Sequence, residues 1–536
     1  MVTFRRVSPL RLIAAAFLVL SSLAAATPCA LSQDVLTYHN NNFRTGLNSL
    51  ETKLTWNNVN SASFGRLFTL SVDGRVDAEP LYLSTVPIPG GGTHNLLIVA
   101  TEHDSVYAFD ADTGSPIWHI TALKSGETTS DDRGCGQVYP EIGITSTPVI
   151  SRPNGSNGVI YTVAMSKDST GHYHQRLHAL DATTGDELYG GPAEIQAKYP
   201  GHGDNSSGGF VIFDPAQYKE RSGLLLVGNQ VYLAWASHCD IRPYTGWVMA
   251  YNTTTLAQTS VINVTPNGSD GAIWGSGAGL AVDQSGNIFF LDANGIFDTN
   301  LNPQGFPGSG DYGNAFVRLT TKGGLAAADY FEMDNGVQES SGDIDLGSGG
   351  ALLLPEMKDS LGNLWQLAVG AGKDSNLYVV NRNSMGKFHT SSNNIYQELD
   401  GVLPGGMWSM PAYFSGRLYF GPVAQPLLEF QFRNAKLVTK PIAKTTNAFD
   451  YPGTSPSISS NKTTNAIVWA SENTNPAVLH AYNALSLVEL YNSNQAANGR
   501  DHFGAGNKFI IPMIANGKVY VGTSNGVGVF GLLPPP

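Results

Sequence analysis

The chain has 536 residues, of which 42% are hydrophobic and 14% are charged, with 60 Gly, 29 Pro and 3 Cys. The charged fraction is well below the roughly 25% of an average soluble protein, and the hydrophobic content is ordinary, which excludes disorder driven by self-repulsion. A formal net charge of -12 and the lack of a basic run argue against nucleic acid and anionic membrane surfaces as partners.

The N-terminus has the pattern of a secretory signal peptide, which we assign to residues 1–33. Basic residues precede an apolar run from Leu12 to Leu23, and small residues follow it. The run is shorter than the roughly 20 residues that span a bilayer. We therefore expect an exported protein, periplasmic or extracellular, without a membrane span. Cleavage after Ala26 and cleavage just before Gln33 both remain open.

Three cysteines bear on the redox compartment. Cleavage before Gln33 would remove Cys29 and leave Cys135 and Cys239. An even number of cysteines in an oxidising compartment predicts one disulfide, Cys135–Cys239. Two buried free thiols are the alternative.

A degenerate repeat follows the signal peptide. Strand-like pairs recur at intervals of mostly about 50 to 70 residues, with Gly, Asn and Pro between them, near 96–110, 159–181, 231–252, 288–320, 367–381, 418–432, 467–483 and 518–530. Each unit has room for about four strands, and no long stretch has a helical apolar period. This predicts an all-β chain in which residues 34–536 form one β-propeller domain of eight four-stranded antiparallel blades, with seven blades as the alternative.

The repeat carries a turn motif that is complete once, at Ala108, Asp110, Thr113, Gly114 and Trp118. An Asp can bond its own downstream backbone, and Gly tolerates a positive φ, so the motif predicts a tight turn between strands. The Trp would then fill the wedge between neighbouring sheets, which is a structural role. The last repeat needs a partner for its edge strand, and residues 64–72 are the candidate.

This motif resembles the docking motif of pyrroloquinoline quinone (PQQ) type propeller repeats, of the quinoprotein alcohol dehydrogenase-like superfamily. The resemblance extends over nearly the whole mature chain and implies an eight-bladed fold. The opening residues 37–46 also look like the start of uncharacterised secreted proteins with such repeats. The same repeats occur in dehydrogenases of alcohols and sugars and in propellers that only bind other proteins, so two kinds of function remain open.

Five loops that lead into the expected inner strands combine Gly with Ser, Thr, Trp or a carboxylate, at 139–148, 271–279, 343–350, 405–411 and 450–456. A quinoprotein would need an aromatic floor under PQQ, a Ca²⁺ held by carboxylate and amide oxygens, and an Asp as general base. The candidate catalytic residues are Glu141, Asp343 and Asp345, and the candidate cofactor-binding residues are Trp274, Trp408, Ser276 and Ser146. The alternative is that small residues merely fit where blades crowd together.

Two departures from the quinoprotein pattern shape the functional hypothesis. Cys135 and Cys239 are far apart rather than adjacent, and no Cys-x-x-Cys-His haem motif is present. We therefore expect a non-catalytic binding or scaffold module that takes a protein, glycan or small molecule at the mouth of its channel. The alternative is a PQQ- and Ca²⁺-dependent oxidoreductase of alcohols or sugars. We expect a monomer, with His172 and His174 as exposed polar residues rather than metal ligands.

Overall fold

Repeated antiparallel sheets make up the structure. In this computed structural model the described residues are 1–3, 33–153 and 156–534, and Gln33–Pro536 forms one compact unit. Most of the predicted signal peptide, including Cys29, lies outside the described residues. No described helix is long and apolar enough to cross a membrane.

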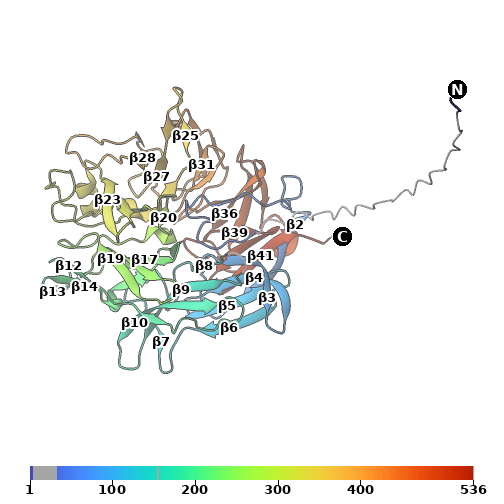
Figure 1. Ribbon diagram of the computed structural model, residues 1–536, viewed down its shortest axis with the longest axis horizontal. Helices are drawn as coiled ribbons and strands as arrows, with labels where there is room; N and C mark the ends of the chain where they lie inside the picture. Colours follow the sequence, from blue (N-terminus) through green and yellow to red (C-terminus); the bar gives the residue numbers. More distant parts are fainter. Residues whose placement is uncertain (4–32, 154–155, 535–536) are drawn as a thin grey trace. The chain divides into compact units, whose positions relative to one another are not determined.

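The described residues contain eight sheets of four or five strands (Figure 1). In chain order, their strands are β3 (Leu81–Ile88), β4 (Gly92–Ala100), β5 (Ser105–Asp110) and β6 (Pro116–Thr121); β7 (Thr128–Thr129), β8 (Val149–Ser151), β9 (Val159–Lys167), β10 (Tyr173–Asp181) and β11 (Ala193–Glu194); β15 (Tyr218–Glu220), β16 (Leu225–Val227), β17 (Gln230–Ser237), β18 (Trp247–Asn252) and β19 (Gln258–Asn263); and β20 (Ala281–Val282), β21 (Ile288–Leu291), β22 (Phe316–Thr320) and β23 (Ala326–Phe331).

The second half of the chain forms the other four sheets. Their strands are β24 (Leu352–Leu353), β27 (Leu367–Gly370), β28 (Leu377–Asn381) and β29 (Gln397–Leu399); β30 (Ala412–Phe414), β31 (Arg417–Phe420), β32 (Leu428–Arg433), β33 (Lys436–Leu437) and β34 (Ala443–Lys444); β35 (Ser457–Asn461), β36 (Thr464–Glu472), β37 (Val478–Asn483) and β38 (Glu489–Asn492), joined by β1 (Leu47–Asn48); and β39 (Met513–Ala515), β40 (Lys518–Thr523) and β41 (Gly526–Leu532), joined by β2 (Phe64–Ser71).

Smaller elements lie in the connections between strands and between sheets. They are the sheet of β12 (Lys198–Pro200), β13 (Ser206–Ser207) and β14 (Phe210–Ile212), the pair β25 (Met357–Lys358) and β26 (Leu364–Trp365), the helix α1 (Gly336–Ser341), and the 3-10 turns η1 (Pro215–Gln217), η2 (Gly275–Gly277), η3 (Leu346–Ser348) and η4 (Ala497–Gly499). The predicted all-β class with four-stranded antiparallel sheets is confirmed, and each of the eight expected strand pairs is the central pair of one large sheet.

The two ends of the unit share a sheet. β2 pairs antiparallel with β41, with Phe64 opposite Leu532 and Ser71 opposite Gly526. Figure 1 shows these blue and red strands side by side. Residues of the first and last large sheets, such as Leu83 and Tyr520, also belong to one buried hydrophobic cluster. The prediction that residues 64–72 complete the last sheet is therefore confirmed, and this pairing removes an open edge.

The turn motif joins one sheet to the next. Asp110 Oδ1 accepts the Thr113 backbone N–H at 2.7 Å and the Thr113 hydroxyl at 2.9 Å. Trp118, on β6, donates its indole N–H to the Ala182 carbonyl at 3.0 Å. A Cβ at Gly185, the matching glycine of the next repeat, would lie 2.8 Å from the Trp118 ring. The Trp therefore packs over a position that only glycine leaves open.

The N-terminal segment Val35–Asn48 holds the first strands of all the large sheets. Its backbone carbonyls accept N–H groups from β3, β8, β20, β24, β30 and β35, and the side chains of Asn42 and Asn48 bond carbonyls of β16 and β39. Fourteen residues span at most about 50 Å when fully extended. The eight first strands must therefore converge around this segment, as they do in a propeller.

Candidate functional site

A cavity of about 390 Å³ lies where loops enter the first strands of the sheets. It has the size of a small-molecule site. The residues that line it are Gln137, Lys219, Arg221, Ala236, Ser237, Cys239, Asp240, Trp274, Ala293, Asn294, Asp343, Asp345, Lys373, Trp408, Tyr451 and Phe509. The N-terminal segment accepts the backbone N–H groups of Val282 and Leu353, which are the last residues of β20 and β24. The loops that line the cavity enter these strands at their first residues. The cavity and the segment therefore lie toward opposite ends of the first strands.

Four of the predicted site residues meet in this cavity: Trp274, Asp343, Asp345 and Trp408. Each precedes the first strand of a sheet, so neighbouring loops converge although the residues are far apart in sequence. The other three predicted residues do not line the cavity. Glu141 bonds His103 at 2.9 Å and the Thr129 hydroxyl at 2.8 Å. Ser146 is buried, and Ser276 is buried with its hydroxyl donated to the Ser348 carbonyl at 2.7 Å.

Asp345 is the centre of a polar group within the cavity. Its Oδ2 accepts the Trp274 indole N–H at 2.9 Å, and its Oδ1 lies 2.5 Å from Lys373 Nζ. Lys373 also donates to Asp343 at 2.6 Å. Burial raises the pKa of Asp345, although Lys373 opposes the rise. Burial disfavours the charged form of Lys373, but its two carboxylate partners outweigh this effect and raise its pKa.

Asn294 adds an unused acceptor beside these carboxylates. Its Nδ2 donates to Asp343 Oδ1 at 2.8 Å. Its Oδ1 is buried and has no hydrogen-bond partner among the described residues. A buried carbonyl oxygen without a partner costs free energy, so this atom is a natural position for a cation or a donor on a ligand.

Aromatic rings and cations form the rest of the cavity. Trp274 meets Phe509 edge-on at 6.0 Å between ring centroids, and Trp408 meets Tyr451 in the same way at 6.2 Å. Arg221 lies 4.8 Å from the centroid of Phe509, and Lys373 lies 5.8 Å from that of Trp408. The cavity therefore combines flat apolar surfaces with positive charge, which suits a planar anionic ligand.

The predicted disulfide is confirmed, since Cys135 and Cys239 are bonded, and Cys239 lines the cavity. The sequence patterns did not single out Lys219, Arg221 or Lys373 as site residues. Each of them lies beside an expected strand of a repeat, but many other residues do so too.

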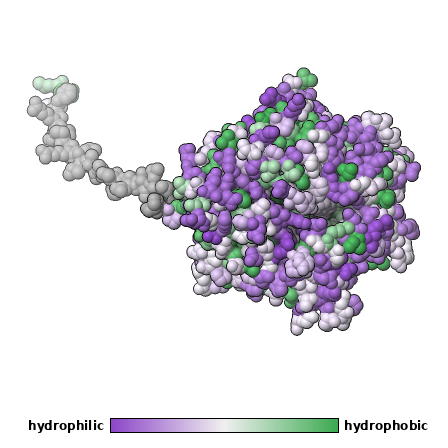
Figure 2. Space-filling view, turned by 180° about the vertical axis from the view of Figure 1, so that it is seen from behind, coloured by the Kyte–Doolittle hydropathy of each residue, from purple (hydrophilic) through white to green (hydrophobic). Residues whose placement is uncertain are grey.

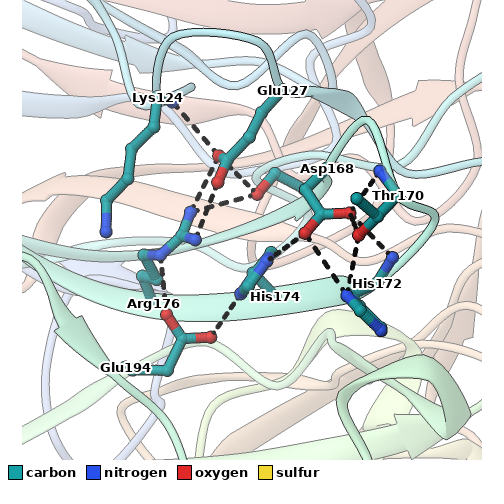
Figure 3. Close-up of polar contacts among 9 residues, drawn as sticks. Lys124, Glu127, Asp168, Thr170, His172, His174, Arg176 and Glu194 are labelled. Carbon is teal, nitrogen blue, oxygen red and sulfur yellow. Dashed lines mark hydrogen bonds and ion pairs between the residues drawn. The ribbon is translucent and has the colours of Figure 1, made fainter.

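The two histidines of the His-x-His pattern lie in a network on the second large sheet (Figure 3). His174 contacts Glu194 at 2.8 Å and Asp168 at 3.6 Å, and the side chain of His172 is 78% exposed. Arg176 bridges Glu127 and Glu194. Among the residues with described positions, no group of three or more His, Cys, Asp or Glu side chains could hold a metal ion.

Comparisons with known proteins identify the fold. The quinohemoprotein alcohol dehydrogenase from Comamonas testosteroni superposes with a TM-score of 0.61 at 13% identity, covering 94% of this chain and 82% of that one. A europium-containing methanol dehydrogenase gives a TM-score of 0.62 at 12% identity, covering 93% and 98%. The chain has the fold of the quinoprotein alcohol dehydrogenases. The quinohemoprotein alcohol dehydrogenase ADHIIG from Pseudomonas putida HK5 gives a TM-score of 0.60 at 13% identity, covering 94% and 82%.

The expected resemblance to this superfamily is thus confirmed at the level of the fold. No family model and no curated protein matches the sequence. At 12–13% identity the superpositions establish architecture alone.

Proposed function

We propose that the cavity binds PQQ together with a hard metal cation and that the protein is an oxidoreductase of alcohols or sugars. The observation that carries this proposal is the meeting of Trp274, Asn294, Asp345 and Lys373 in one cavity of a quinoprotein-type fold. This favours the oxidoreductase over the non-catalytic binding module that the missing motifs suggested. The eight large sheets further support a ring of eight blades in one domain from residue 34 to residue 536.

The residues of the cavity fit such a group. The orphaned Asn294 Oδ1 and the carboxylates of Asp345 and Asp343 are the hard oxygen donors that Ca²⁺ or a lanthanide prefers. The donors include only two carboxylates, and Lys373 already contacts both. A bound cation would therefore share these carboxylates with the lysine. The Trp274 and Trp408 rings offer flat surfaces, and Lys373 would contact a carboxylate of PQQ.

When bound, PQQ would supply the two-electron acceptor for the reaction. The protein's own contribution would be to orient the substrate and move a proton. Asp345 would accept the substrate hydroxyl proton, and the raised pKa of its buried carboxyl makes it a stronger base than an exposed Asp. Trp274 would position Asp345 through the indole hydrogen bond to Oδ2.

We also propose that the protein is exported to the periplasm or outside the cell and acts as a monomer. The signal-peptide pattern of residues 1–33 and the Cys135–Cys239 disulfide support export. The surface in Figure 2 is largely hydrophilic with scattered apolar residues, which fits a protein surrounded by water.

The test is calorimetric titration of the mature protein with PQQ in the presence of Ca²⁺ or a lanthanide, followed by dye reduction with alcohols and sugars. We expect saturable binding. Lys373→Met should weaken PQQ binding about tenfold or more, because one charged contact is lost. Asp345→Asn should lower dye reduction about 100-fold or more, because the base is lost, and should also weaken PQQ binding, because a donor to the cation loses its charge.

Matched controls are Lys440→Met and Asp400→Asn, which change exposed residues that do not line the cavity. Both should behave as the wild-type protein does. If neither cation supports saturable PQQ binding, the oxidoreductase proposal is wrong and the binding module becomes the better hypothesis.

A further inference from the structure

Two buried cations on one wall of the cavity form no ion pair with any described residue. Lys219, on β15, and Arg221, just after it, are each 5% exposed and line the cavity. Being two residues apart along an extended segment, they point to the same side. Within the described parts of the chain neither forms an ion pair, and Arg221 Nε has no hydrogen-bond partner.

Burial and the neighbouring Arg221 lower the pKa of Lys219 to about 8, and they outweigh Glu102, Asp77 and Asp240, which favour its charged form without an ion pair to it. Asp240 lines the cavity, but its carboxylate accepts the hydroxyls of Tyr244 at 2.7 Å and Ser237 at 3.1 Å. Burial raises the pKa values of Glu102 and Glu220, which keeps both carboxyls protonated at higher pH than usual. Lys373, in contrast, contacts two carboxylates. The protein has a net charge of -12, yet none of its described acids forms an ion pair with these two cations.

The surroundings of Arg221 hold it in a defined orientation. Its guanidinium lies 4.8 Å from the centroid of Phe509, and Phe509 in turn meets Trp274 edge-on. Trp274 bonds Asp345. The cavity therefore has a cationic wall at Lys219 and Arg221 and an acid-base wall at Asp345, with aromatic rings connecting them.

We propose that Lys219 and Arg221 bind the carboxylate of the substrate, and that the substrates are hydroxy acids or sugar acids. A guanidinium presents two parallel N–H groups that match a carboxylate, and an adjacent ammonium adds charge. Burial strengthens these contacts, since there is little water to compete. With its carboxylate held by Lys219 and Arg221, such a molecule would direct a hydroxyl toward Asp345 on the opposite wall. The assignment of substrate class rests on the proposed function, whereas the carboxylate subsite does not.

The test is calorimetric titration of the mature protein, without PQQ, with D-gluconate, D-glucuronate and L-lactate, and with the neutral polyol D-glucitol. We expect at least one acid to bind at least tenfold more tightly than D-glucitol. The double variant Lys219→Met, Arg221→Met should abolish that preference. Methionine keeps an apolar stem of similar length, and a circular dichroism spectrum and thermal melt identify a variant that fails to fold. Arg221→Lys retains the charge without the paired donors and should bind with intermediate affinity.

The control is the double variant Arg433→Met, Lys440→Met, which alters two exposed cations. Equal binding of acids and D-glucitol, no binding of any acid, or acid binding that survives the double substitution would overturn the proposal. If the double substitution weakens PQQ binding but spares acid binding, the two cations serve the cofactor, and the proposal is wrong although the proposed function stands. If an acid binds through this pair but PQQ never binds, the subsite stands and the proposed function fails.

Discussion

Arg44 gives the sharpest test of how the N-terminal segment holds the sheets together. The side chain is fully buried. Its Nε donates to the Leu280 carbonyl at 2.9 Å, and its Nη1 donates to the Tyr38 carbonyl at 2.8 Å and the Thr37 hydroxyl at 2.7 Å. Burial lowers its pKa only to about 10, so it stays charged at neutral pH. It therefore connects the segment to the region of β20.

Arg44→Met removes these donors, leaves the Leu280 and Tyr38 carbonyls unpaired, and removes a longer contact of 3.5 Å from Nη2 to the Leu224 carbonyl. Each buried polar group without a partner costs about 1–3 kcal/mol, so the free energy of unfolding should fall by about 2–6 kcal/mol. The measurement is urea-induced unfolding followed by tryptophan fluorescence, with Arg433→Met as the exposed control. A loss below about 1 kcal/mol, or one equal to that of the control, would contradict the role given to Arg44, because surface changes usually stay within about 0.5 kcal/mol.

Further predictions concern pH and the disulfide. Burial raises the pKa of Glu79 to about 8, so the folded protein keeps a proton that the unfolded chain releases near pH 4.5, and this group's contribution to stability falls as pH rises from about 4.5 to 8. The free energy of unfolding of Glu79→Gln should therefore rise relative to that of the wild-type protein across that range. If the difference between the two proteins stays the same at every pH, the prediction is wrong. Cys135 and Cys239 are 104 residues apart, and the double variant Cys135→Ser, Cys239→Ser should lose roughly 4–5 kcal/mol in the chain-entropy model. Peptide masses after alkylation, with and without reductant, test the bond itself, and free thiols on both residues would refute it.

Local patterns predicted the repeated part of the fold. Alternating apolar residues mark strands, and Asp, Thr and Gly mark the turns between them, because these interactions form within a few residues of one another. Asp110 and Thr113 bond each other within one turn. The pairing of residues 64–71 with β41 was also predictable, since an edge strand at the end of a closed repeat needs a partner.

The functional cavity was predictable only in part. Trp274, Asp343, Asp345 and Trp408 stood out because their loops combine glycine with a bulky or acidic residue. Lys219, Arg221 and Lys373 carried no such signal, and Glu141 came from a loop of the same composition yet lies outside the cavity. Composition identifies a loop, but the direction of a side chain depends on how that loop packs against the loops of other sheets.

The sequence by itself therefore determined the all-β class, the eight strand pairs, the turns and the cysteine pair, since each rests on local chemistry or on counting. Only the tertiary structure decided that residues 35–48 bond the first strands of all eight large sheets, and that unpaired cations face Asp345 across one cavity. The physical reason is distance along the chain. Lys219 and Phe509 share a cavity because the sheets converge, and no local pattern records which residues such convergence brings together.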